Sequence, residues 1–496
     1  MQLRYVDDAP EAHETELLAC AVTRGTQTPE GALAALDELL GGRVARVLAS
    51  GDMKGHVDEE ILLYADDSGP RRILLLGVGE PGEITAEVAR RMAARAVRYA
   101  ERLDLASLSV CLDGLGGLAD EAKAQAVAEG AALAAWRFRE LRAPLVEDPE
   151  VDVTSVALVG AGDTDALATG TVNGAIVARA ENFARMLQSR PGNLATPSLI
   201  AQEAERMAGA VGLEVTVFDE ARMAAEGMHA ILAVSQGSEQ EARLVVLEHK
   251  GGKTGDPPLV LVGKGLSFDA GGISIKPAAG MERMKFDMSG GAAVIAAMQA
   301  IAELGVRANV VGIVPSSENL PSGSAVKPGD VIRTLAGKTV EVINTDAEGR
   351  LILADALAYG ARMKPAAMVD CATLTGGVVV ALGHHAAAVL GNDDELIDQV
   401  IDAGEKAGQR CWELPIWEDY KRQLDSETAD LQNVGGRDGS TITAACFLSE
   451  FVDDVKWAHL DIAGTAYGDG TAPYHRKGGY GLPTRLLVEW VRSRTR

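Results

Sequence analysis

The sequence predicts an α/β protein of two domains, a smaller N-terminal α/β domain and a larger C-terminal α/β domain with a mostly parallel, mixed sheet. Three observations predict it. The 496 residues exceed what one ordinary hydrophobic core organises. Short apolar runs alternate with helical patterns, which is typical of strands covered by helices. A stretch rich in proline and acidic residues, LRAPLVEDPEVD, interrupts that alternation and marks a domain change.

The N-terminal domain is expected to span residues 1–170. Its strand-like runs lie at residues 71–80, 107–113 and 153–160, and its helical patterns at residues 84–103 and 122–141. A long helical pattern over residues 171–192 is interpreted as a helix that links the two domains.

The C-terminal domain is expected to span residues 193–496. Its strand-like runs lie at residues 213–219, 242–249, 258–265, 308–315, 338–345 and 366–372, and helical patterns at residues 289–304 and 350–363. Strands separated by helices imply a largely parallel sheet that is covered on both faces.

Composition excludes several classes of protein. Hydrophobic residues make up 47% of the chain but come in short runs, so no membrane span is expected. The longest apolar stretch, residues 376–391, is interrupted by His384 and His385 and is interpreted as a buried loop and strand.

The N-terminus lacks a secretory signal, so we expect a cytoplasmic protein. The five scattered cysteines are interpreted as reduced thiols. A net charge of −24 disfavours nucleic acid as a partner.

Residues 77–82, GVGEPG, fit the G-x-G-x-x-G pattern of dinucleotide sites between a predicted strand and a predicted helix. Pro81 removes an amide from the loop that would cradle pyrophosphate, and Glu80 adds a negative charge there. We therefore favour a plain strand-to-helix turn over a nucleotide site.

Two clusters of charged residues carry the candidate chemistry. In the first, residues 262–291, a strand ends at Lys264 and a glycine-rich segment follows, with Asp269, Lys276 and Asp287. In the second, Asp346, Glu348 and Arg350 stand two residues apart after the run at residues 338–345, so an extended backbone would project all three to the same side. Both clusters follow predicted strands, where open α/β sheets place their sites.

Four converging carboxylates repel one another unless cations lie between them. Lys264, Lys276 and Arg350 are one source of positive charge, and bound divalent metals are the other. Taken singly, each acidic residue is better explained as a helix cap or a solvated charge. Taken together, they indicate a metallohydrolase with two ions such as Zn²⁺, Mn²⁺ or Mg²⁺.

The two clusters resemble the signature segments of the leucyl aminopeptidases, the M17 metallopeptidases. The similar stretches are VGKGLSFDAGGISIKP at residues 262–277 and NTDAEGRLILADAL at residues 344–357, and the second is the most diagnostic. The resemblance extends through DCATLTGGVVVALG, WELPIWEDY, ADLQNVGGRDGSTITAACFLSEFV and WAHLDIAG, and is only loose in the N-terminal half.

The resemblance implies a metal-dependent aminopeptidase that releases N-terminal residues, leucine-like and other neutral ones, by hydroxide attack between two metals. Lys264, Asp269, Asp287 and Glu348 would bind one metal, and Asp269, Asp346 and Glu348 the other. Lys276 would be a catalytic electrophile. Arg350 would hold a bicarbonate ion that acts as general base.

The resemblance also implies the surroundings of that site. The pocket for the first side chain would be lined by Met284, Thr373, Gly376, Ala463 and Ala466, and backbone groups around Leu374 would help hold the substrate. Histidine takes no part in the implied site. The family resemblance further implies a homohexamer that acts on peptides.

Two alternatives come from other classes of protein. Some bacterial relatives also bind DNA, so a DNA-binding or architectural role is one, although the acidity and the absence of a basic stripe count against it. A catalytically inert scaffold is the other, and it is disfavoured because all seven central residues are present.

Overall fold

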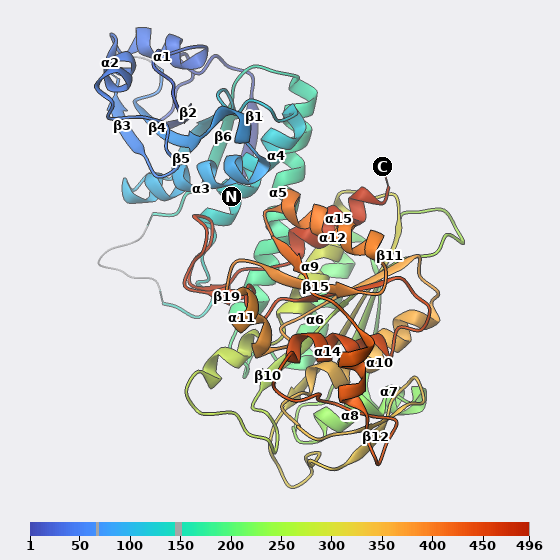
Figure 1. Cartoon of the computed structure of the whole chain (residues 1–496). Coiled ribbons are helices and arrows are strands. Elements are labelled where there is room, and N and C mark those ends of the chain that lie inside the picture. Colours follow the sequence, from blue (N-terminus) through green and yellow to red (C-terminus); the bar gives the residue numbers. More distant parts are fainter. Residues whose placement is uncertain (66–68, 144–150, 496) are drawn as a thin grey trace. The chain divides into compact units, whose positions relative to one another are not determined.

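The computed structural model describes residues 1–65, 69–143 and 151–495 (Figure 1). The chain divides into two compact units. Unit 1 contains Met1–Arg179 and Gly470–Arg476, and unit 2 contains Ala180–Asp469 and Lys477–Arg496. The division falls inside one long helix, α5 (Thr164–Ser189), which begins earlier than the helical pattern at residues 171–192.

Unit 1 is an open sheet with helices on both faces. Its elements are β1 (Gln2–Val6), β2 (Leu18–Thr23), α1 (Ala32–Leu39), α2 (Arg43–Ser50), β3 (Glu60–Tyr64), β4 (Arg72–Gly79), η1 (Pro81–Glu83), α3 (Ala86–Arg102), β5 (Ser107–Cys111), α4 (Asp120–Ala135) and β6 (Ser155–Val159). The strand order is β1-β6-β5-β2-β4-β3, and β3 is antiparallel to β4. The predicted strands β4, β5 and β6 and the predicted helices α3 and α4 are confirmed.

Segments far apart in sequence complete unit 1. Tyr474, from the short Gly470–Arg476 segment, lies in the hydrophobic core beneath α3 and α4 and donates a hydrogen bond to Glu87 (2.9 Å). A segment of the C-terminal half thus contributes to the core of the N-terminal unit, which no local pattern in the sequence predicts.

Unit 2 is built on a larger mixed sheet. Its elements before the second acidic cluster are α6 (Pro197–Val211), β7 (Glu214–Phe218), α7 (Glu220–Glu226), α8 (His229–Ser235), β8 (Arg243–Lys250), β9 (Leu259–Gly263), β10 (Gly265–Asp269), η2 (Met281–Phe286), α9 (Ser289–Glu303), β11 (Asn309–Asn319), β12 (Val331–Arg333) and β13 (Thr339–Glu341). The later elements are α10 (Gly349–Arg362), β14 (Ala367–Ala372), α11 (Gly376–Leu382), β15 (Ala387–Gly391), α12 (Asp394–Ala407), β16 (Cys411–Glu413), α13 (Glu418–Lys421), η3 (Arg422–Leu424), β17 (Leu431–Gln432), α14 (Ser440–Ser449), β18 (Trp457–Asp461), β19 (Tyr467–Gly468), β20 (Gly478–Gly479) and α15 (Thr484–Ser493).

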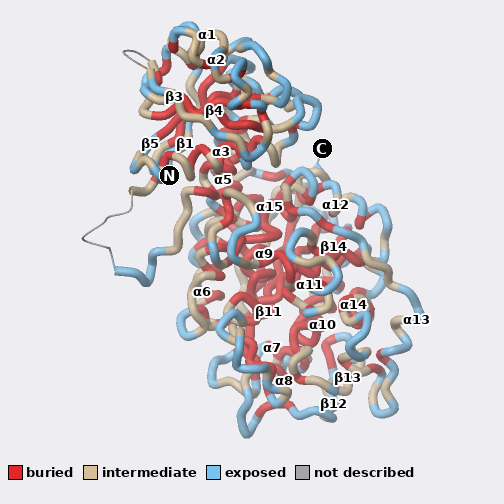
Figure 2. The backbone as a smooth tube through the Cα atoms, turned by 60° about the vertical axis from the view of Figure 1, so that its left-hand side comes forward, coloured by how far each residue is buried: buried red, intermediate tan, exposed pale blue. Residues whose placement is uncertain are grey.

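The main sheet of unit 2 has the strand order β16-β15-β18-β14-β9-β11-β8-β7, with β10 paired to β11. The central strands β18, β14, β9 and β11 are parallel to one another, whereas β15 and β8 run antiparallel to their inner neighbours. The expected mixed, mostly parallel sheet is confirmed. Its central strands are buried along their length (Figure 2), as strands covered on both faces should be.

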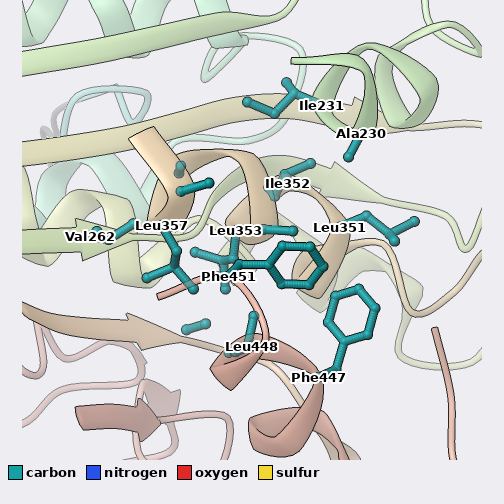
Figure 3. Close-up of a cluster of buried hydrophobic side chains, with 14 of the residues drawn as sticks. Ala230, Ile231, Val262, Leu351, Ile352, Leu353, Leu357, Phe447, Leu448 and Phe451 are labelled. Atoms are coloured by element: carbon teal, nitrogen blue, oxygen red, sulfur yellow. The ribbon is translucent and has the colours of Figure 1, made fainter. Parts of the chain in front are cut away.

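The core of unit 2 packs α10 and α14 against one face of this sheet. Leu351, Leu353 and Leu357 of α10 meet Phe447 and neighbouring apolar side chains (Figure 3). Helix α9 packs on β9, β11 and β14 through its buried alanines and glycines. The packing fixes the first turn of α10, which carries part of the second acidic cluster.

Two local expectations for unit 2 are wrong. The apolar stretch at residues 376–391 forms helix α11 followed by strand β15, rather than a loop and a strand, because Thr375 caps the helix by accepting a hydrogen bond from the amide of Val378. The predicted strand at residues 338–345 is reduced to β13, which belongs to a separate sheet with β12 and β17. None of the helices that the described residues form is long and apolar enough to cross a membrane.

Candidate metal centre

The first acidic cluster lies where β9 and β10 end. Lys264 separates these two strands, and Asp269 is the last residue of β10. In the parallel pairing of β10 with β11, Asp269 stands opposite Asn319. The buried Oδ1 of Asp269 accepts hydrogen bonds from the amide of Gly271 (2.8 Å) and from Nδ2 of Asn319 (2.9 Å). The carboxylate is therefore held in one orientation.

The second cluster differs from the expected extended geometry, and that expectation is wrong. Asn344 begins a turn in which its side chain accepts a hydrogen bond from the amide of Asp346 (2.9 Å). Glu348 has helical backbone angles (φ −75°, ψ −33°) at the start of α10, and Arg350 lies in the first turn of that helix. The three side chains therefore project from a turn and from the start of a helix, not from one side of a strand.

The structure nevertheless brings the two clusters together. Lys264 Nζ lies 2.7 Å from Asp287 Oδ2 and 2.9 Å from Glu348 Oε1. Lys276 Nζ lies 2.6 Å from both Asp269 Oδ2 and Asp346 Oδ1. One oxygen each from Asp269, Asp346 and Glu348 lies within 4.8 Å of the other two. All six charged side chains thus surround one small volume.

The electrostatics of this volume favour added positive charge. Burial raises the pKa of Asp287 to about 7; the nearby Lys264 opposes the rise, and Glu348 adds to it. Burial, together with repulsion from Glu348, also raises the pKa of Asp269. Burial lowers the pKa of Lys264, but the carboxylates of Asp287 and Glu348 raise it more, so the net change is upward. Buried carboxylates with so few counter-charges fit oxygen-preferring divalent ions.

Arg350 is buried next to the acidic centre. Its NH1 donates a hydrogen bond to the carbonyl of Asn433 (2.7 Å), and burial lowers its pKa to about 10. Within the described ranges its Nε has no hydrogen-bond partner although it is buried. A buried guanidinium edge with a free donor fits a small planar anion.

The predicted pocket residues differ in accessibility. Thr373 is close to the centre, because its Oγ1 donates to Asp287 Oδ1 (2.7 Å) and its carbonyl accepts from Lys264 Nζ (3.1 Å). Gly376 is exposed and faces open space, and Ala463 is partly buried. Ala466, in contrast, is fully buried. The last two predicted residues, Met284 and Leu374, are partly buried.

Three residues that support the site were not among the predicted ones: Asn319, Asn433 and Asp461. Asn319 escaped notice because the predicted strand stopped at residue 315, whereas β11 continues through four buried polar residues. Polar residues that directly follow an apolar run are the one local signal that could have found it. Asn433 and Asp461 lie far from both clusters in sequence.

Comparison with known proteins finds relatives that match most of the chain. The sequence profile "Cytosol aminopeptidase family, catalytic domain" matches residues 182–488, and "Cytosol aminopeptidase family, N-terminal domain" matches residues 20–145. A probable cytosol aminopeptidase from Acidithiobacillus ferrooxidans is 44% identical over 470 residues, covering 93% of this chain and 93% of the relative. One from Geobacter sulfurreducens is 42% identical over 466 residues, covering 94% of each.

Solved structures agree with the sequence relatives. A tomato leucine aminopeptidase variant superposes with a TM-score of 0.89 at 31% identity, covering 99% of this chain and 96% of that one. A bottromycin maturation enzyme in complex with Mn superposes with a TM-score of 0.84 at 34% identity, covering 97% of this chain and 100% of that one. The similarity therefore includes both units.

Proposed function

The chain belongs to the cytosol aminopeptidase family, and from that membership we propose that it releases N-terminal amino acids from peptides by a two-metal mechanism. It is a hydrolase of this family. The observation that carries the proposal is the convergence of Asp269, Asp346 and Glu348 with Lys264 and Lys276.

We assign the side chains to two divalent ions. Lys264, Asp269, Asp287 and Glu348 would hold one ion, and Asp269, Asp346 and Glu348 the other. Two such ions supply Lewis-acid activation of water and of the scissile carbonyl. Zn²⁺ and Mn²⁺ suit the mixed set of amine and carboxylate donors, with Mg²⁺ as the third candidate. The Mn in the related bottromycin maturation enzyme supports Mn²⁺.

Lys276 is assigned to the substrate carbonyl. Burial lowers its pKa, but Asp269 and Glu348 raise it more, so the side chain remains an ammonium at neutral pH. A protonated Lys276 beside the scissile bond donates a hydrogen bond to the oxygen that gains negative charge as water attacks. This role requires the lysine to exchange its present carboxylate contacts for one with the substrate.

Arg350 is assigned to a bicarbonate ion, which supplies a proton acceptor beside the attacked bond. Its Nε, for which the described residues offer no hydrogen-bond partner, supports this assignment, because a planar anion accepts parallel hydrogen bonds from one edge of a guanidinium. Asn433 fixes the other end of the guanidinium through its carbonyl.

The free N-terminal amine of the peptide would bind to the metal centre, which would hold the first carbonyl at the site and restrict cleavage to the chain end. We propose that the first side chain enters beside Met284, Gly376 and Ala463, with Thr373 and Ala466 behind them, and that Leu374 contributes backbone contacts. Leucine-like and other neutral side chains fit such an apolar surface.

We further propose a cytoplasmic homohexamer. Large apolar side chains exposed on unit 2, among them Val380 (89% exposed), Trp412 (65%) and Trp417 (60%), support an assembly that covers them. Sedimentation should give a mass near six chains, and a stable monomer would refute this part of the proposal.

The test is hydrolysis of leucine p-nitroanilide by purified protein, before and after chelation. We expect chelation to abolish activity, and Zn²⁺ or Mn²⁺ to restore it. Asp346→Ala should lose at least 100-fold in kcat/KM, whereas Asp330→Ala, which removes an acid that pairs with Lys327, should not. Activity that survives both chelation and Asp346→Ala would refute the proposal.

A further inference from the structure

Asp461 is a completely buried carboxylate outside the proposed metal set. It ends β18, and its carboxylate accepts hydrogen bonds from residues 374–375 and from Ala463. Its Oδ1 accepts hydrogen bonds from the amides of Leu374 (3.2 Å) and Ala463 (3.2 Å). Its Oδ2 accepts one from Thr375 Oγ1 (2.6 Å). Burying a carboxylate costs folding free energy unless such donors surround it, so a buried carboxylate at this place calls for an explanation.

The amide of Leu374 connects Asp461 to the metal centre. The same peptide group contains the carbonyl of Thr373, which accepts a hydrogen bond from Lys264 Nζ (3.1 Å). In a trans peptide the N–H and the C=O point in opposite directions. Asp461 therefore accepts a hydrogen bond from one side of this peptide group, and Lys264 donates one to its other side.

This arrangement matters because of what Lys264 would have to do. A neutral amine that binds a metal must aim its single lone pair at the ion and its N–H groups at acceptors. The Thr373 carbonyl is one such acceptor, and donation from Leu374 to a carboxylate strengthens it, since hydrogen bonds in a chain polarise one another. The orientation of this one peptide thus sets the orientation of the amine.

The same carboxylate also fixes part of the proposed substrate pocket. Through Ala463 it holds the turn after β18, and through Thr375 it holds the start of α11, directly before Gly376. Buried side-chain hydrogen bonds hold β18 itself in place. Asp370 of β14 contacts His459 Nδ1 (2.6 Å) and accepts a hydrogen bond from Trp457 Nε1 (2.7 Å).

We propose that Asp461 is a positioning residue of the aminopeptidase site, which orients the Lys264 amine through the peptide between Thr373 and Leu374 and holds the Ala463 side of the pocket. The inference rests on the proposed function. Asp461 itself touches neither metal nor substrate.

The chain offers a matched control in Asp355. This carboxylate is also completely buried in unit 2 and also accepts three hydrogen bonds, from the amides of Ala230 (2.9 Å), Ile231 (3.1 Å) and Leu335 (2.7 Å). It lies about two turns further along α10 than Glu348. Its loss should cost stability as the loss of Asp461 does, but without effect on the metal.

The experiment compares Asp461→Asn and Asp461→Ala with Asp355→Asn and Asp355→Ala in the full chain. Zn²⁺ affinity is measured by competition with a chelator, and kcat and KM are measured on leucine and alanine p-nitroanilides, all per folded molecule. We expect Asp461→Ala to weaken Zn²⁺ binding 10- to 100-fold and to lower kcat. Asp461→Asn, which keeps one oxygen for both amides but accepts less strongly, should weaken binding about threefold to tenfold. Both Asp355 variants should retain wild-type affinity and kcat.

Wild-type Zn²⁺ affinity in Asp461→Asn would overturn the inference even if Asp461→Ala fails to fold. Equal losses in the Asp355 variants would overturn it too, because the effect would then reflect general destabilisation. If the unaltered protein neither binds Zn²⁺ nor hydrolyses either amide, the proposed function fails instead. The two failures are therefore distinguishable.

Discussion

Asn319 should control the affinity of the site for metal, although it is assigned to no ion. Its Nδ2 donates one hydrogen bond to Asp269 (2.9 Å) and another to the carbonyl of Thr345 (3.0 Å), so it joins the two acidic clusters. A hydrogen bond to a charged acceptor contributes about 1.5–3 kcal/mol and one to a neutral acceptor about 0.5–1.5 kcal/mol. If about 2 kcal/mol of this sum serves to hold Asp269 in place, Asn319→Ala weakens metal binding about 30-fold.

The matched control lies on the same strand. Asn309 begins β11 as Asn319 ends it, roughly 33 Å away at about 3.3 Å per residue. Its Nδ2 also donates two hydrogen bonds, to the carbonyls of Lys253 (2.9 Å) and Asp256 (3.2 Å). Chelator competition for Zn²⁺ should show the loss in Asn319→Ala and none in Asn309→Ala. Equal affinity in the two variants would refute the argument that Asn319 organises Asp269.

Three further predictions concern other parts of unit 2. Lys276→Gln should bind metal as the wild type does but lose roughly 100- to 1,000-fold in kcat on leucine p-nitroanilide, and unchanged kcat would exclude Lys276 as the electrophile. Gly376→Val should fill open space in the pocket and raise KM for leucyl more than for alanyl substrates; parallel changes would place the pocket elsewhere. Burial raises the pKa of Asp355 to about 7 against the effect of its three amide donors, so the folded state binds more protons than the unfolded state between about pH 4 and 7. Its contribution to the free energy of unfolding then falls as pH rises through that window. Asp355→Asn should remove this fall, as measured by urea titrations of chelated protein at several pH values. If the free energy of unfolding changed with pH equally in both proteins, the prediction would be wrong.

Regular elements were predictable where apolar residues repeat with one period over a long run. The strand β9 is apolar throughout because both of its faces are buried, and helix α10 has a clear helical pattern. Strands β1, β2 and β3 were not predicted. β1 and β3 are the edge strands of the unit 1 sheet and no residue of either is fully buried, so neither has the continuous apolar run of a central strand. Tyr474 shows a further limit, because its partners in unit 1 lie hundreds of residues away.

The composition of the candidate site was predictable from residue types and order, but its geometry was not. Asp346, Glu348 and Arg350 suggested one face of a strand, and the turn at Asn344 converts them into a loop and a helix end. Supporting groups such as Asp461 act through backbone amides, so they depend on which chain segments fold beside them. A single sequence has no local pattern for such contacts.

The proposed mechanism requires two metal ions in the acidic centre. Mass spectrometry of the folded protein, loaded with Zn²⁺ and freed of excess, counts the ions directly. We predict two ions per chain in the wild type and one in Asp346→Ala, because Asp346 is assigned to only one of them, with hydrolysis of leucine p-nitroanilide appearing only as the second ion binds. Full activity with a single ion, or two ions in Asp346→Ala at wild-type activity, would contradict the account.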